Sequence, residues 1–299
     1  MTEPQTARIG LPTGVTLNVQ LAGEGEPIVF LHGFPESHRC WRHQVHGLMA
    51  DHWIIAPDQR GFGGSDKPEG VDEYRAEKPI ADLIALADAL GIDRFTPVGH
   101  DWGGVIAWMA AREHPDRIAR LVIVNAPHPW IFQRSQIEDE AQRVASQYVN
   151  LLRRPGAEAG ITAMGLDTFF DRVIGANADV SDLPAEERQA YIDDWKQPGA
   201  LTAMTNWYRA SGLVVPEPGQ EASLPLWTQR PFPPIGVPTL VLWGMKDTAL
   251  LPVQLEGLEK LVDDLRVVTV PDAGHFVQWE KPEIVTRAIR DFVAATPQD

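Results

Sequence analysis

Short apolar runs rich in β-branched residues recur along the chain, and helical patterns of apolar residues separate them. The runs predict six strands, over residues 27–31, 53–56, 95–98, 121–124, 239–242 and 267–270. The helical patterns between and after them cover residues 79–90, 103–114, 253–262 and 282–293. This alternation predicts an α/β fold, with a mostly parallel sheet flanked by helices on both faces.

The alternation of strands and helices stops between residues 128 and 236. This stretch predicts helices alone, over residues 137–152, 185–195 and 200–210. It ends in a proline-rich segment, with 7 prolines among the 28 residues 211–238, a composition typical of a stiff, extended linker. We therefore expect a core made of residues 1–127 and 237–299, and an inserted helical cap over residues 128–236 with a Pro-rich return segment.

Composition and charge exclude several classes of protein. The chain has 26 Lys and Arg against 41 Asp and Glu, a formal net charge of −15, which disfavours binding to nucleic acid or to an anionic membrane surface. Its single cysteine, Cys40, leaves no intrachain disulfide and no thiolate zinc cluster. The sequence has neither a run of about 18 apolar residues nor a signal-peptide pattern. We expect a cytoplasmic protein that does not bind membranes.

The main chemical signal is Gly99-His100-Asp101-Trp102-Gly103, at the expected junction of a strand and a helix. Glycines two residues on either side permit a tight turn that exposes the middle side chain above the sheet, as in the serine elbow of hydrolases. Here the middle residue is Asp101. A carboxylate is ionised at neutral pH and can attack a carbon that bears a leaving group, forming an ester. The alternative role for Asp101 is that of a helix N-cap.

Two further residues complete the pattern of a catalytic triad. Asp247 follows one predicted strand and His275 follows the next, so both are expected at the carboxyl edge of the sheet, near Asp101. In this order, His275 is the general base and Asp247 orients it. The alternatives are a turn-capping aspartate and a surface histidine. Asp272 is a rival acid, although its position three residues before His275 favours capping of its own turn.

The loop after the first predicted strand reads His32-Gly33-Phe34-Pro35. Its glycine and proline allow a sharp turn, so that the N–H groups of Phe34 and Trp102 can point at one oxygen and form an oxyanion hole. His32 could act as a second base, but beside such a hole a structural role is favoured.

Together, these motifs and the run of residues 58–65 resemble those of the epoxide hydrolases with an α/β-hydrolase fold, from about residue 10 to about residue 295. The resemblance places the chain in the aspartate-nucleophile branch, which also contains haloalkane and fluoroacetate dehalogenases. Epoxide hydrolases use two tyrosines of the cap, and Tyr148 and Tyr208 match them in spacing. The resemblance implies that both tyrosines donate protons to the epoxide oxygen, and that substrate is bound by His32, Pro35, Trp102, Tyr148 and Tyr208.

Two other functions stay open. Haloalkane dehalogenases share the tryptophan after the nucleophile, but usually have Asn or Glu at the position of Phe34 and lack the tyrosine pair. Fluoroacetate dehalogenases have arginines where this chain has Trp102 and Val105, which disfavours a carboxylate substrate. A non-catalytic ligand-binding protein with this fold would not need Asp101, Asp247 and His275 together.

We therefore expect an enzyme that opens a largely apolar small-molecule epoxide, of unspecified size, to a vicinal diol through an ester of Asp101. The chain has no H-E-x-x-H, no C-x-x-C and no phosphate-binding loop, so we expect neither a metal nor a cofactor. The sequence does not fix the oligomeric state, and a homodimer is compatible with it.

Overall fold

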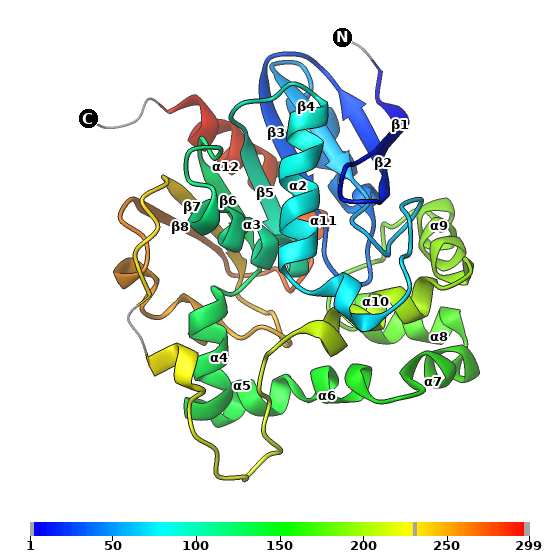
Figure 1. The fold of residues 1–299 in the computed structure, drawn as a ribbon, viewed down its shortest axis with the longest axis vertical. Helices are drawn as coiled ribbons and strands as arrows, with labels where there is room; N and C mark the ends of the chain where they lie inside the picture. The colour runs from blue at the N-terminus through cyan, green and yellow to red at the C-terminus, as the bar shows by residue number, and fades with distance from the viewer. Residues whose placement is uncertain (1–2, 230–231, 296–299) are drawn as a thin grey trace.

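The computed structural model describes residues 3–229 and 232–295 and contains one eight-stranded sheet (Figure 1). The strand order is β1-β2-β4-β3-β5-β6-β7-β8. Strands β3 to β8 pair in parallel, whereas β1 and β2 are antiparallel to their neighbours. The bounds are β1 Gln5–Gly10, β2 Thr16–Ala22, β3 Glu26–Leu31, β4 His52–Pro57, β5 Thr96–His100, β6 Leu121–Val124, β7 Thr239–Gly244 and β8 Leu265–Val270.

The six predicted strands are β3 to β8, each within three residues of its expected bounds. Strands β5, β6 and β7 are buried along their whole length, because helices cover both faces of a parallel sheet. The prediction missed the N-terminal hairpin of β1 and β2. Strand β1 lies at the edge of the sheet and alternates exposed and half-buried residues, so it lacks a continuous apolar run.

Helices pack on both faces of the sheet. Helices α2 and α3 lie on one face, and α12 lies on the other together with α1 and the short α11 (Figure 1). The predicted helix over residues 253–262 is wrong: two 3-10 turns occupy it, and Gly257 between them has a φ of 82°. The bounds are α1 Arg42–Leu48, α2 Glu77–Ala89, α3 Trp102–Glu113, α11 Val277–Glu280 and α12 Pro282–Ala294.

Between β6 and β7 the chain forms helices beside the carboxyl ends of the parallel strands (Figure 1). We call this part the helical insertion. Its division from the core as a separate cap domain stays a prediction, and residues 230–231 of its return segment lie outside the described residues. The helices are α4 Pro129–Glu138, α5 Glu140–Ala145, α6 Gln147–Arg153, α7 Ala157–Met164, α8 Leu166–Phe170, the π-helical η3 Asp171–Gly175, α9 Ala185–Lys196, α10 Ala200–Ala210 and the 3-10 turn η4 Leu226–Gln229.

Two of the three helices predicted in the insertion are present as α9 and α10. The third, over residues 137–152, is divided among α4, α5 and α6. Asp139 has extended backbone angles, and its side chain accepts a hydrogen bond of 2.7 Å from the Gln142 N–H. This cap starts a new helix and ends the previous one. Along the described residues, no helix is long and apolar enough to cross a membrane.

A buried ion pair supports the contact between the core and the insertion. The side chain of Arg60 is fully buried and bonds Asp82 on α2 through two nitrogens, at 2.6 and 2.7 Å. The Arg60 carbonyl accepts a hydrogen bond of 3.1 Å from the indole of Trp207 on α10. Helix α10 is therefore held against a loop whose conformation depends on the Arg60–Asp82 pair.

We expect Asp82→Asn to destabilise the protein by about 3–5 kcal/mol, because it removes the buried counter-charge of the Arg60 guanidinium and leaves only the partly exposed carboxylate of Glu73, at 3.5 Å. Urea unfolding at neutral pH measures the change. The control is Asp72→Asn, which removes an exposed ion pair with Arg75 and should cost less than about 1 kcal/mol. Equal losses in the two variants would contradict the importance of the buried pair.

Candidate active site

Asp101 lies at the turn between β5 and α3. Its backbone has a φ of 49° and a ψ of −121°, a strained conformation for a residue with a side chain. Glycine is needed on both sides of the turn. A Cβ on Gly99 would collide with the carbonyl of Gly103, and a Cβ on Gly103 would collide with the carbonyl of Leu31. The Asp101 side chain makes no capping hydrogen bond to α3, so it is not held as an N-cap.

The loop after β3 approaches Asp101 closely. The Phe34 N–H donates a hydrogen bond of 2.8 Å to Oδ1 of Asp101. A Cβ on Gly33 would lie 2.5 Å from the same oxygen, so only glycine permits this approach. Of the two N–H groups expected to form an oxyanion hole, that of Phe34 is thus already directed at the carboxylate, and Trp102 follows Asp101 at the start of α3.

His32 and Pro35, which the resemblance places in the substrate site, have structural contacts. Among the described residues, neither lines the two cavities that contain Asp101. His32 is fully buried; its Nδ1 bonds the Gly33 carbonyl and its Nε2 accepts from the Gln59 N–H, both at 2.9 Å. Burial lowers the pKa of His32, which favours the neutral ring. The Pro35 carbonyl accepts from the indole of Trp195 on α9, at 2.7 Å.

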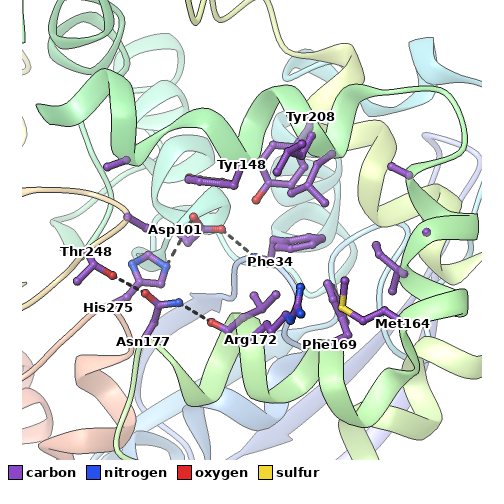
Figure 2. A pocket seen from close by; sticks show the side chains of 18 of the residues that line it. Phe34, Asp101, Tyr148, Met164, Phe169, Arg172, Asn177, Tyr208, Thr248 and His275 are labelled. Atoms are coloured by element: carbon purple, nitrogen blue, oxygen red, sulfur yellow. Dashed lines mark hydrogen bonds and ion pairs between the residues drawn. The ribbon is translucent and has the colours of Figure 1, made fainter. Parts of the chain in front are cut away.

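His275 and Asp247 lie beside Asp101, on the loops that follow β8 and β7. Nδ1 of His275 is 2.7 Å from Oδ2 of Asp247. Its Nε2 is 3.9 Å from Oδ2 of Asp101 (Figure 2). Asp247 is buried. The rival acid, Asp272, is exposed and pairs with Lys281 at 2.6 Å. The structure thus brings together the three residues expected to form a triad.

Each oxygen of Asp247 has its own partners. Oδ1 accepts from the N–H groups of Ala249 and Leu250, at 2.9 and 2.8 Å, and so caps its own turn. Oδ2 accepts from Nδ2 of Asn125 at 2.8 Å as well as from His275. Burial opposes ionisation, but the charge of His275 and these hydrogen bonds keep the pKa of Asp247 below its ordinary value.

The surrounding carboxylates favour the protonated form of His275. Burial alone would lower the pKa of this imidazole, but the charge and hydrogen bond of Asp247, together with the charge of Asp101, raise it to about 9. At neutral pH the ring is therefore an imidazolium, placed between two carboxylates. If the charge of Asp101 is lost, the pKa of His275 falls, so the imidazolium loses its proton more readily and the neutral ring becomes available as a base.

Tyr148 on α6 and Tyr208 on α10 lie on the insertion side of Asp101 (Figure 2). Their ring centroids are 6.1 Å apart, with the planes nearly perpendicular. Burial is the main cause that raises the pKa of both phenols well above the ordinary value, and the charge of Asp101 adds to it. Both phenols keep their protons at neutral pH and can donate hydrogen bonds into the space beside Asp101.

Two cavities, of about 570 and 430 Å³, meet at the same three residues: Asp101, Tyr148 and Tyr208. The first cavity extends between the insertion and the loop of His275, and the second extends between α3 and α4. Among the residues that line only the first are Leu151, Ile161, Met164, Phe169, Arg172, Val173, Asn177, Thr248 and His275. Among those that line only the second are Trp102, Val105, Met109, Phe132, Leu213 and Trp227.

Several contacts at the site escaped the sequence analysis. Both ring nitrogens of His100 are bonded at 2.9 Å, one to the Glu36 carboxylate and one to the His275 carbonyl. The Asn177 carbonyl accepts from the His275 N–H at 3.2 Å. His100 belongs to one of the recognised motifs and Glu36 directly follows another, so they could have been proposed as buried partners. Asn177 lies in a loop of the insertion with no motif around it.

The described residues contain no cluster of three or more His, Cys, Asp or Glu side chains that could hold a metal ion. With its own side chains, the site can supply a carboxylate for nucleophilic attack, two phenols for proton donation and an imidazole for proton transfer.

Comparison with known proteins identifies the family. The family model described as alpha/beta hydrolase fold matches residues 26–282. The chain is 36% identical to the AB hydrolase superfamily protein YfhM of Bacillus subtilis, covering 94% of this chain and 95% of that protein. It is 32% identical to epoxide hydrolase A of Mycobacterium tuberculosis, covering 96% and 97% of the two chains.

A solved structure gives the same result for the fold. It is the structure of an epoxide hydrolase of the alpha/beta hydrolases superfamily, found in metagenomes from hot environments. It superposes on this chain with a TM-score of 0.91. The two chains are 43% identical, and the match covers 99% of this chain and 100% of the other. The chain therefore belongs to the α/β-hydrolase fold family, in the group of hydrolases that includes the epoxide hydrolases.

Proposed function

We propose that this protein is an epoxide hydrolase that opens an epoxide to a vicinal diol through a covalent ester of Asp101. The observation that carries the proposal is the placement of Tyr148 and Tyr208 over Asp101, where both cavities meet. A carboxylate nucleophile suits several leaving groups, but two protonated phenols suit one that departs as an alkoxide. The similarity to epoxide hydrolases over nearly the whole chain supports the same reaction.

In the first step, Oδ2 of Asp101 attacks an epoxide carbon, and the bond from that carbon to the ring oxygen breaks. The ring oxygen takes a proton from the tyrosine pair as its negative charge develops. An alkoxide is a strong base, so phenols with raised pKa values are sufficiently acidic to protonate it. Oδ1, held by the Phe34 N–H, becomes the carbonyl oxygen of the ester.

In the second step, His275 removes a proton from a water molecule that attacks Cγ of Asp101. Negative charge develops on Oδ1, where the N–H groups of Phe34 and Trp102 stabilise it; one such donor typically contributes about 2.7–4 kcal/mol. The bond between Cγ and Oδ2 then breaks, and Oδ2 leaves in the diol with the proton from His275. The regenerated carboxyl group gives its proton to His275, which restores the imidazolium and the Asp101 carboxylate.

The charge of Asp101 controls when His275 can act as a base. Before the first step this carboxylate helps to keep the ring protonated. Formation of the ester removes the charge, so the pKa of His275 falls. The imidazolium then gives up its proton, which replaces the one that the tyrosine pair lost in the first step, and the neutral ring can deprotonate water. We propose that the helical insertion acts as a cap which covers this site and limits access of bulk water, and that the substrate is largely apolar because the cavity walls are.

The first test is a single turnover of styrene oxide in ¹⁸O-labelled water. Since water attacks Cγ and Oδ2 leaves with the diol, we expect unlabelled diol in the first turnover and ¹⁸O in the peptide that contains Asp101. Mass spectrometry of the diol and of the digested protein measures both.

A trapped ester provides the complementary observation. His275→Gln should form the ester without hydrolysing it, so the intact protein should gain the mass of one substrate molecule, whereas Asp101→Ala should gain none. Labelled diol in the first turnover would disprove the ester. Absence of diol, with bromide release from a bromoalkane, would favour a haloalkane dehalogenase instead.

The tyrosine pair is tested by removing each hydroxyl group. Tyr148→Phe and Tyr208→Phe should each lower the rate of ester formation from styrene oxide by about 10²-fold, and the double variant should show no detectable ester. Stopped-flow fluorescence of the ten-tryptophan protein measures this step. The matched control is Tyr191→Phe, since Tyr191 is buried on α9 and lines neither cavity. Unchanged rates in both single variants would rule out the proposed role.

The pKa of His275 also predicts how stability depends on pH. Folding raises this pKa from 6.5 to about 9, so the folded state binds more protons than the unfolded state in that range. The stabilisation is complete below pH 6.5 and is lost as the pH rises to about 9, a change on the order of 3 kcal/mol. Urea unfolding of the wild type and of His275→Gln should therefore converge toward pH 9. A constant difference across this range would contradict the assigned shift.

A further inference from the structure

The sheet ends in a strand, β8, that has a partner on one side only. Its neighbour is β7, and β8 lies at the edge of the sheet opposite to β1 (Figure 1). In the described part of the chain, no other backbone group forms a hydrogen bond to its outer side. Such an edge is a template for pairing with another chain, and proteins usually protect it with proline, charge or a bulge.

The sequence of β8 favours pairing. It reads Leu265-Arg266-Val267-Val268-Thr269-Val270, with four β-branched residues and neither proline nor glycine. Val267, in the middle of the strand, is 42% exposed. The other edge strand, β1, has two β-branched residues and ends in a glycine, which weakens a strand. Of the two edges, β8 is therefore the better template.

The hydrogen bonds to β7 show which groups of β8 face outward. The N–H of Thr239 donates to the Asp264 carbonyl at 2.9 Å, and the N–H of Met245 donates to the Val270 carbonyl at 3.0 Å. Since the N–H and C=O of one residue point to the same side of a strand and alternate along it, the even-numbered residues face β7. The outward groups therefore belong to Leu265, Val267 and Thr269.

We infer that a second copy of this chain pairs with this edge, antiparallel to it, about a two-fold axis at Val267. In this register Val267 lies opposite Val267 of the second copy, and Leu265 lies opposite Thr269 in both directions. Every outward N–H and C=O of the strand then has a partner, because each of these pairs exchanges both hydrogen bonds. The pairing joins two eight-stranded sheets into one, through an interface that uses the same surface of both copies.

The charges along β8 favour this register over its neighbours. If the axis moves to Arg266, that arginine lies directly opposite its own copy. If the axis moves to Val268, Asp264 lies opposite Asp272 of the second copy. Like charges directly opposite each other destabilise a pair of strands. With the axis at Val267, Arg266 lies opposite Val268 and Asp264 lies opposite Val270, so no like charges meet.

The two ends of the strand are complementary in charge. Asp263 and Asp264 are exposed at its amino end. At its carboxyl end lies Lys246, which is exposed and bonds the loop after β8 through its N–H. Lys281 lies at the same end, paired with Asp272 at 2.6 Å. Antiparallel pairing brings the acidic end of one copy to the lysines of the other, which stabilises the dimer.

The interface lies away from the proposed reaction centre. None of the β8 residues lines the two cavities that contain Asp101, so pairing leaves both cavities of each copy unobstructed by the strand itself. An interface built on one six-residue strand and the loops beside it is at the small end for a specific complex. We therefore expect a dimer with a Kd of about 1–10 µM.

The first test is sedimentation equilibrium of the purified chain at about 0.15 M salt. The wild type should show a reversible equilibrium between monomer and dimer. Val267→Pro should be a monomer, because proline removes an outward N–H and leaves the hydrogen bonds to β7 intact. Val267→Thr, which keeps the backbone groups and a β-branched side chain, should remain a dimer. Val71→Pro is not a matched control, since Val71 is in a 3-10 turn; Val71→Lys, at an exposed valine of 39%, serves for the charged variants below.

A charge exchange tests the two-fold axis itself. Val267→Lys and Val267→Glu should each raise the Kd by at least about tenfold, because each places like charges opposite each other. An equimolar mixture of the two variants should form a heterodimer, since lysine then faces glutamate. Val71→Lys should keep the wild-type Kd. This mixture also decides the question if Val267→Pro does not fold.

Three results would overturn the inference. The first is a wild type that stays monomeric at about 100 µM. The second is a dimer whose Kd is the same in the wild type, Val267→Lys and Val267→Glu, because the interface would then lie elsewhere. The third is a mixture of the two charged variants that stays monomeric, because Val267 would then not meet its own copy.

Discussion

The hydrogen bond between the Phe34 N–H and Oδ1 of Asp101 requires two loops to meet within 2.8 Å at the carboxyl edge of the sheet. Backbone without a Cβ is needed on both sides of this contact, at Gly33 after β3 and at Gly103 after the strained turn. Because β3 and β5 are neighbours in the sheet, the fold supplies the proximity. The position of the carboxylate then determines where the imidazole and the phenols have to lie.

The helical insertion reaches the same region through side chains that bond backbone of the core. The indoles of Trp195 and Trp207 donate to the carbonyls of Pro35 and Arg60. These residues lie on the two helices, α9 and α10, that the sequence predicted best. The indole of Trp195 bonds the loop that contains Phe34. Trp207 directly precedes Tyr208 in the chain. The contacts that attach the insertion to the core therefore also help to position Tyr208 relative to the carboxylate.

The sequence was sufficient to predict the parallel sheet and the grouping of Asp101, Asp247 and His275, because glycine spacing and strand ends are local signals. It was insufficient where the structure depends on individual side-chain contacts, most of them between residues far apart in the sequence. Residues 137–152 have a continuous helical pattern, yet the cap formed by Asp139 divides it. Asn125 and Asn177 hold Asp247 and His275, but an asparagine outside a motif carries no signal of its partner.

The bond from the His275 N–H to the Asn177 carbonyl joins the loop of the imidazole to the helical insertion. The Asn177 side chain also accepts a hydrogen bond from the hydroxyl of Thr248, next to Asp247 in the chain. In the proposed reaction, a movement that lifts this part of the insertion to release the diol would break both contacts. The loop of the proposed base would then be less well held in the open molecule, so the proposed hydrolysis of the ester would be favoured while the site is closed.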